Sequence, residues 1–203
     1  TEASKRFPPA NVLALINDKN LECRLRGVRA LGALGGPGAS EAILEAITPY
    51  RDRQYEKLTP LEKHLVQAGL RSLGRLRQPV AFEELLAFFK QVGWARYAAD
   101  ALGEFGDRRA IGPLVAAYPK FAWGLKREIP ELYPHDDNSS SGMSPEDRRY
   151  ETPYAISVAL SRLLLDDPAD TAALREIIPH LAANRPSDWD GGMIYEPEAF
   201  EAI

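Results

Sequence analysis

Residues Ala98–Tyr118 read AADALGEFGDRRAIGPLVAAY, and their pattern is the strongest indication of the fold. A run of small and apolar residues ends at Gly106-Asp107, and a second apolar run begins within a few residues. Glycine directly after a helix suits the left-handed backbone conformation that ends it. The stretch therefore predicts two helices joined by a tight turn.

The same pattern occurs three times along the chain. Each block has a Leu-Gly pair, namely Leu31-Gly32, Leu73-Gly74 and Leu102-Gly103. Turn-forming sequences follow these pairs, at Gly35-Gly36-Pro37, Gln78-Pro79 and Gly106-Asp107, and apolar residues then return. Such self-similarity indicates a repeat architecture. In such an array, each helix pair covers the apolar face that its neighbour leaves open.

Apolar residues recur with helical spacing inside each block, and no segment alternates with the two-residue period of a strand. In the first block two adjacent stripes are apolar, one formed by Leu21, Leu25, Val28 and Leu31 and one by Cys23, Gly27, Ala30 and Leu34. We expect helices near residues 9–17, 21–34, 39–49, 60–76, 80–91, 94–105, 108–118, 153–165 and 169–183.

Local signals support these boundaries and this packing. Thr59-Pro60-Leu61-Glu62 is predicted to start a helix, because Thr59 can cap it and Glu62 can complete a capping box. The polar loop 50–58, YRDRQYEKL, lengthens the second block. The small side chains of Ala98, Ala99 and Ala101 are expected to let neighbouring helices approach closely. We predict an all-α fold, an α-α superhelix of about four helix pairs, with a plain antiparallel bundle as the alternative.

Composition narrows the class of protein. Hydrophobic residues make up 45% of the 203, which is enough for a continuous core, and the net charge of −4 argues against a general nucleic-acid binder. No apolar run approaches the roughly 20 residues that span a bilayer, so we expect no membrane contact and a cytoplasmic location. Cys23 is the single cysteine, and its place on an apolar stripe predicts a buried small hydrophobe. The chain begins TEASKRFPPA, without methionine, which we interpret as part of a longer protein.

The string ADALGEFGDRRAIGPLVAA, residues 99–117, closely resembles HEAT repeats of the phycobilisome-lyase type, with their ALG-x-x-GD-x-x-A-x-x-x-L core. Asp18 followed by Arg24 also resembles the HEAT pattern. Two positions depart from it: Leu65-Val66 stands where an apolar-Arg pair is expected, and Arg96 is one place out of register. The resemblance covers residues 9–118 well and 153–183 weakly. It implies HEAT-like repeats in 1–129 and a last helix pair of the same solenoid in 152–183. Composition predicts a flexible insertion in 130–151 and an acidic, aromatic tail in 184–203.

The resemblance also implies that the second helix of each pair lines a concave face. The residues left on those helices outside the buried stripes are Arg26, Arg29, Gln67, Arg71, Arg75, Asp100, Glu104 and Arg162. They predict a surface that is basic at its N-terminal end and acidic in its middle. Such a surface suits a protein partner of complementary charge, whose own acidic surface would face the basic end. The alternative is a solvated face with intramolecular ion pairs.

Signals of catalysis are missing from the sequence. His64, His135 and His180 do not form a His-Glu-x-x-His motif, and no Gly-x-Ser-x-Gly or Gly-Lys-Ser/Thr motif occurs. The cluster His135-Asp136-Asp137 lies in a polar segment typical of a surface insertion. We therefore predict no catalytic residue, no metal and no cofactor.

Three functional hypotheses follow. The first is a non-catalytic HEAT-repeat scaffold that mediates protein–protein interaction through its concave face. The second, implied by the resemblance, is a bilin-lyase-like enzyme subunit. The third is a nucleic-acid-binding protein similar to HEAT-like alkylpurine glycosylases, in which Arg26, Arg29, Arg71 and Arg75 track phosphates while Trp94 or Trp123 contacts a base.

Overall fold

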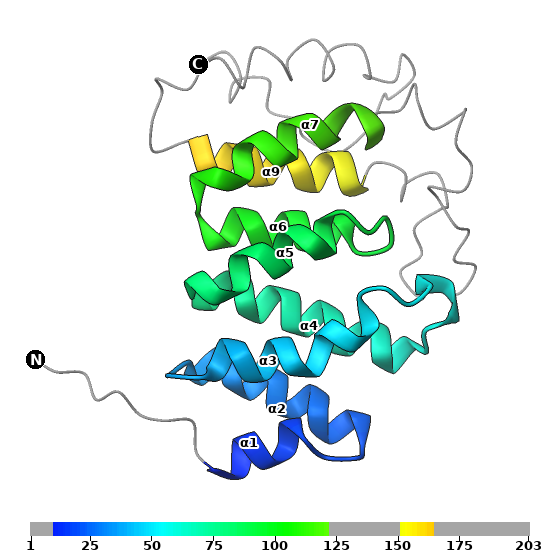
Figure 1. The fold of residues 1–203 in the computed structure, drawn as a ribbon, viewed down its shortest axis with the longest axis vertical. Coiled ribbons are helices and arrows are strands. Elements are labelled where there is room, and N and C mark those ends of the chain that lie inside the picture. Colours follow the sequence, from blue (N-terminus) through cyan, green and yellow to red (C-terminus); the bar gives the residue numbers. More distant parts are fainter. Residues whose placement is uncertain (1–9, 122–150, 165–203) are drawn as a thin grey trace, which may run out of the picture.

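The computed structural model describes residues 10–121 and 151–164, and these residues form a stack of helices (Figure 1). The helices are α1 (Ala10–Ile16), α2 (Leu21–Leu34), α3 (Ala39–Ile47), α4 (Pro60–Leu76), α5 (Phe82–Phe89), α6 (Ala95–Phe105), α7 (Ile111–Phe121) and α9 (Glu151–Leu164). Short 3₁₀ turns lie at Thr48–Tyr50, Tyr55–Lys57, Pro79–Ala81 and Arg108–Ala110. The described part of the chain contains no strand, so the predicted all-α class is confirmed.

The helices form two layers, as an array of helix pairs requires. α2, α4, α6 and α9 pack successively on one another and form what we call the second-helix layer. α1, α3, α5 and α7 form the first-helix layer, in which each helix packs against a member of the second. Figure 1 shows the stack rising from α1 at the bottom to α7 and α9 at the top. The predicted helix 169–183 and tail 184–203, and residues 130–150 of the predicted insertion, lie outside the described residues.

The Leu-Gly pairs make the contacts between successive repeats. Leu31, Leu73 and Leu102 are completely buried. The glycine of each pair faces a small residue on the next helix of the second-helix layer: Gly32 meets Ser72, Gly74 meets Ala101, and Gly103 meets Ala159. The residue before each downstream leucine therefore packs on the preceding glycine, which explains why the motif recurs.

The turn between α6 and α7 is as tight as the sequence predicts. Gly106 has φ of 79°, in the left-handed region, and its N–H donates to the carbonyl of Leu102. The Asp107 carboxylate then accepts a hydrogen bond from the backbone N–H of Arg109 at 2.9 Å and begins the 3₁₀ turn that precedes α7. One helix ends and the next begins within a few residues because both ends are capped.

The start of α4 carries the predicted capping box. The backbone N–H of Glu62 donates to Thr59 Oγ1 at 3.3 Å, and the Glu62 carboxylate accepts from the Thr59 N–H at 2.8 Å. The preceding loop reaches across to the third repeat, where Arg51 pairs with Glu84 of α5 at 2.8 Å. The loop therefore connects two repeats as well as lengthening one.

One apolar stripe of α2 differs from the prediction. Leu25, Val28 and Leu31 form the buried stripe, whereas Cys23 is only half-buried and Leu34 is 61% exposed. The prediction that Cys23 is a buried core residue was therefore wrong. The stripe formed by Cys23, Gly27, Ala30 and Leu34 lies at the edge of the contacts between helices. Within it only Gly27 is buried, because it packs directly on Ile16 of α1.

Candidate functional site

The residues predicted for the binding face all lie on the second-helix layer. Arg26 and Arg29 come from α2, Gln67, Arg71 and Arg75 from α4, Asp100 and Glu104 from α6, and Arg162 from α9. The five arginines are exposed, while Gln67, Asp100 and Glu104 are half-buried. The resemblance pointed to these helices, and helical spacing then selected positions outside their buried stripes.

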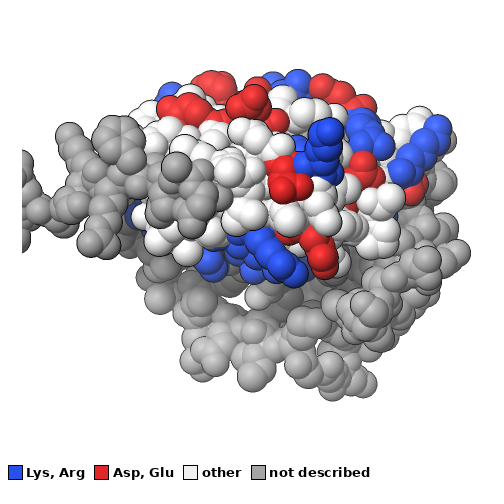
Figure 2. All heavy atoms as spheres, turned by 90° about the horizontal axis from the view of Figure 1, so that it is seen from below, with Lys and Arg blue, Asp and Glu red and all other residues white. Residues whose placement is uncertain are grey.

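Arg26, Arg29, Arg71 and Arg75, which we call the arginine quartet, span two neighbouring helices. The Arg26 side chain is 72% exposed and lies 3.9 Å from Glu22, one turn earlier. Arg29 is exposed and makes no hydrogen bond or ion pair with the described residues. Figure 2, which looks onto the end of the array at α1, shows a group of Lys and Arg side chains at the lower edge of the described atoms with acidic atoms beside it, and both charges along the upper edge.

The two acids on α6 lie among arginines. Burial raises the pKa of Asp100, while the positive charges of Arg96, Arg162 and Arg71 act in the opposite direction. The Glu104 carboxylate lies 3.7 Å from Nε of Arg75. The acidic middle predicted from the sequence is therefore adjacent to compensating cations rather than a separate acidic patch.

Arg96 is a charged neighbour that the sequence reasoning left out of this face. The sequence shows it as a departure by one place from the HEAT pattern, and it precedes Asp100 by four residues on α6. Residues four apart lie on the same side of a helix. That spacing was the signal that could have identified it.

Trp94 has a different role from the one proposed for nucleic-acid binding. Its side chain is 1% exposed, with ring centroids 4.9 Å from Tyr55 and 6.3 Å from Phe88. A tryptophan buried to this extent offers no face on which a base can stack, so Trp94 does not meet the requirement of the nucleic-acid hypothesis that Trp94 or Trp123 contacts a base. The second candidate, Trp123, lies outside the described residues.

The comparison with known families matches this architecture at one repeat. Residues 94–118, which run from the start of α6 through the Gly106-Asp107 turn into α7, match the PBS lyase HEAT-like repeat. The chain therefore contains a HEAT-like repeat at residues 94–118. No curated protein and no solved structure matches the chain significantly. The HEAT-like repeat identifies the helical scaffold, and its residues are those that form the turn and the contacts between helices.

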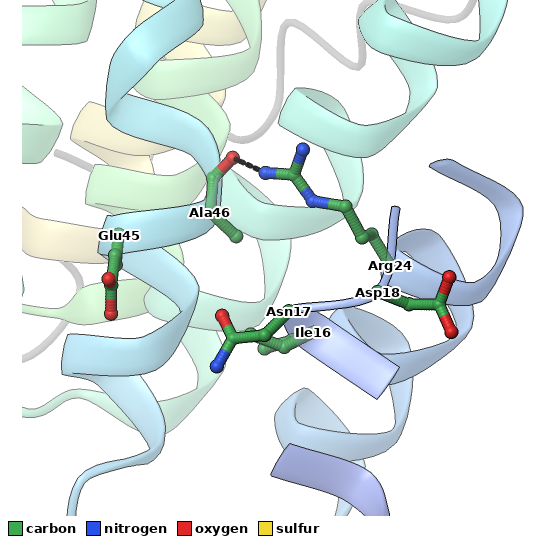
Figure 3. A pocket seen from close by; sticks show the side chains of 6 residues that line it. All are labelled: Ile16, Asn17, Asp18, Arg24, Glu45 and Ala46. Carbon is green, nitrogen blue, oxygen red and sulfur yellow. Dashed lines mark hydrogen bonds between the residues drawn. The ribbon is translucent and has the colours of Figure 1, made fainter. Parts of the chain in front are cut away.

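The HEAT-like pattern at Asp18 and Arg24 has a structural role. Arg24 donates from Nη2 to the carbonyl of Ala46 at 3.0 Å and from Nη1 to the Tyr50 hydroxyl at 3.3 Å. Asp18 accepts instead from the backbone N–H of Asn20 at 2.8 Å. Figure 3 shows the Asp18 carboxylate pointing away from the Arg24 guanidinium. Arg24 thus joins the first HEAT-like pair to the end of α3.

A small pocket lies beside this arginine, lined by Ile16, Asn17, Asp18, Arg24, Glu45 and Ala46 (Figure 3). Its volume is about 200 Å³, below the roughly 300 Å³ at which ligand pockets usually begin. No histidine, cysteine or hydroxyl side chain lines it. We assign no chemistry to this pocket.

Within residues 10–121 and 151–164, no group of three or more His, Cys, Asp or Glu side chains could hold a metal ion. None of the helices within these ranges is both long and apolar enough to cross a bilayer.

Proposed function

We propose that this HEAT-like repeat protein is a non-catalytic scaffold that binds a partner protein through the exposed face of its second-helix layer. The observation that carries the proposal is the arginine quartet. The four arginines come from the adjacent helices α2 and α4, and all four residues are exposed. Such a surface attracts a partner of negative potential.

The glycine contacts favour a concave shape for this face. Gly32, Gly74 and Gly103 allow close approach within the second-helix layer. Helices α1, α3 and α5 contain no glycine at all. An array whose helices pack more closely in one layer curves towards that layer, so we expect the arginine quartet to lie on the inner side of the curve.

The nucleic-acid hypothesis has less support. Three carboxylates, those of Glu22, Asp100 and Glu104, lie beside the arginines and would repel phosphates. Trp94 is buried and offers no stacking surface. A protein partner can place its own cations against these carboxylates, whereas a uniform phosphate backbone cannot.

Affinity capture from native cell extract tests the proposal. The bait is this chain, compared with the double variants Arg26→Glu/Arg29→Glu and Arg71→Glu/Arg75→Glu. The control Lys57→Glu/Lys90→Glu makes the same change in charge at exposed lysines outside the second-helix layer. Circular dichroism must show equal helicity for all four proteins.

We expect one protein to be retained by the wild type and the control and to be lost from both arginine variants. Equal retention by the arginine variants would overturn the proposed face. Retention of nucleic acid in place of protein, removed by nuclease and by moderate salt, would overturn the protein-scaffold function itself.

A further inference from the structure

We propose that the arginine quartet binds an extended acidic segment of the partner protein, in a polyproline II conformation with a carboxylate at every third residue. This inference rests on the proposed function and specifies the chemistry of the partner. It follows from the donors that remain available, the spacing of α2 and α4, and the charges on α6.

Most hydrogen-bond donors of the arginine quartet are available to a ligand. Each guanidinium carries five N–H donors and pairs well with carboxylates. Arg29 has no ion pair among the described residues, and Arg26 has only the 3.9 Å approach to Glu22. Nε of Arg75 lies 3.7 Å from Glu104, and the Arg75 side chain is 62% exposed. The intramolecular pairs therefore leave most of the donors directed at solvent.

The relative position of α2 and α4 is fixed by two contacts. Gly32 faces Ser72, and Gln78 beyond the end of α4 donates to the carbonyl of Gly36 beyond the end of α2 at 3.0 Å. The two helices therefore run in the same direction with their C-terminal ends together. Arg29 precedes Gly32 by one turn, and Arg71 immediately precedes Ser72, so the two arginines lie at similar heights on adjacent helices.

This arrangement selects a spacing in the ligand. Packed helices lie about 8–10 Å apart. A polyproline II chain has three residues per turn and a rise of 3.1 Å, so every third residue faces the same side at intervals of about 9 Å. In a β-strand the third residue faces the opposite side, and same-side residues lie about 6.6 Å apart. A segment that crosses α2 and α4 in polyproline II form therefore presents one carboxylate to each helix.

The next helix limits how far the acidic run extends. Asp100 and Glu104 on α6 follow the quartet along the array and would repel further carboxylates. The segment must therefore be neutral or basic where it reaches α6. The variant Glu104→Gln should increase the affinity for an acidic segment, because it removes the carboxylate that now lies beside Arg75.

Fluorescence anisotropy with the full 203-residue chain tests this inference. The first labelled peptide contains repeats of Glu-Pro-Pro. The second has the same composition with its glutamates contiguous, and in the third lysine replaces glutamate. A single-stranded oligothymidylate of equal charge is the fourth probe.

We expect the Glu-Pro-Pro peptide to bind most tightly. Arg26→Glu/Arg29→Glu should weaken its binding by about 4- to 25-fold, from about two- to fivefold for each exposed charge pair. Glu104→Gln should strengthen binding by about two- to fivefold, which a misfolded protein would not do. Lys57→Glu/Lys90→Glu should leave the affinity within about twofold.

Other outcomes overturn the inference in distinguishable ways. Equal affinity for the two acidic peptides would overturn the spacing argument. Absence of peptide binding, while a protein is still captured through the arginines, would overturn the inference and leave the proposed function standing. Tighter binding of the oligothymidylate, lost in the arginine variants, would overturn both.

Discussion

Gly74 of α4 packs directly against the backbone of Ala101 on α6. A Cβ atom at Gly74 would lie 2.7 Å from the Ala101 carbonyl oxygen. The obstacle is backbone, which cannot rotate away as a flexible side chain could. Gly103 stands in the same relation to Ala159 of α9, where a Cβ would lie 2.7 Å from the Ala159 Cα. These contacts set the distance between successive repeats.

Gly74→Ala and Gly103→Ala should therefore destabilise the array. The added methyl group forces adjacent helices apart, and overpacking of this kind costs about 1–3 kcal/mol in the free energy of unfolding. Denaturation with urea, followed by circular dichroism, measures the loss. Gly112→Ala in α7 is the control, because a Cβ there meets nothing within 4 Å. It should be neutral or stabilise α7 by up to about 1 kcal/mol. Equal effects at all three positions would contradict this account.

Gln78 joins the first two inter-repeat turns through its amide. Nε2 donates to the Gly36 carbonyl at 3.0 Å, and Oε1 accepts from the Ser40 backbone N–H at 3.2 Å, at the start of α3. Gln78→Ala removes both bonds and should lower the free energy of unfolding by about 1–2 kcal/mol. Gln54→Ala, at an exposed glutamine, should change it by less than about 0.5 kcal/mol. Equal stability of the two variants would show that the bridge contributes nothing.

Glu62 should make the stability depend on pH in the acid range. The hydrogen bond from the Thr59 backbone N–H lowers the pKa of Glu62, and the Arg53 and Thr59 side chains act in the same direction. A carboxyl whose pKa is lower in the folded state stabilises the fold above its unfolded pKa, near 4.3, and this stabilisation is lost as the pH falls through the folded pKa.

Glu62→Gln should therefore cost about 1 kcal/mol at neutral pH, and its difference from the wild type should shrink on acidification. Thermal unfolding at a series of pH values measures this convergence. Glu56→Gln, at an exposed glutamate, should follow the wild type at every pH. A Glu62→Gln deficit that stayed constant down to pH 2 would contradict the pKa argument.

Trp94 should be a major contributor to the core. It is among the largest fully buried side chains, and its ring contacts Tyr55 and Phe88 edge to face. Trp94→Ala should lower the free energy of unfolding by about 3–5 kcal/mol, and Trp94→Phe should cost less because it keeps part of the buried surface. Urea denaturation of the two variants checks the order. A stable Trp94→Ala protein would mean that the side chain is not in the core.

The arginines of the candidate site could be predicted from the sequence, whereas their neighbours across repeats could not. Helical spacing selected the arginines because a surface position depends on the period of its own helix. Arg96 could have been added by the same helical spacing, because it lies one turn before Asp100 on α6. Which cations lie beside Asp100 and Glu104 depends on the neighbouring helices, since Arg75 comes from α4 and Arg162 from α9. The loop 50–58 was predicted only as an interruption, whereas Arg51 and Asp52 connect it to Glu84 and Gln91 in the third repeat.

The local structure could be predicted from the sequence: the helices, the Gly106-Asp107 turn, the capping box at Thr59 and the repeat. Each of these depends on backbone preferences and hydrogen bonds within a few residues. The packing of the helices was needed to show that Gly32, Gly74 and Gly103 are contact points between repeats, that Trp94 is buried and that Cys23 is only half-buried. Those outcomes depend on which surfaces of separate helices meet, and burial is a property of the assembled array rather than of any one helix.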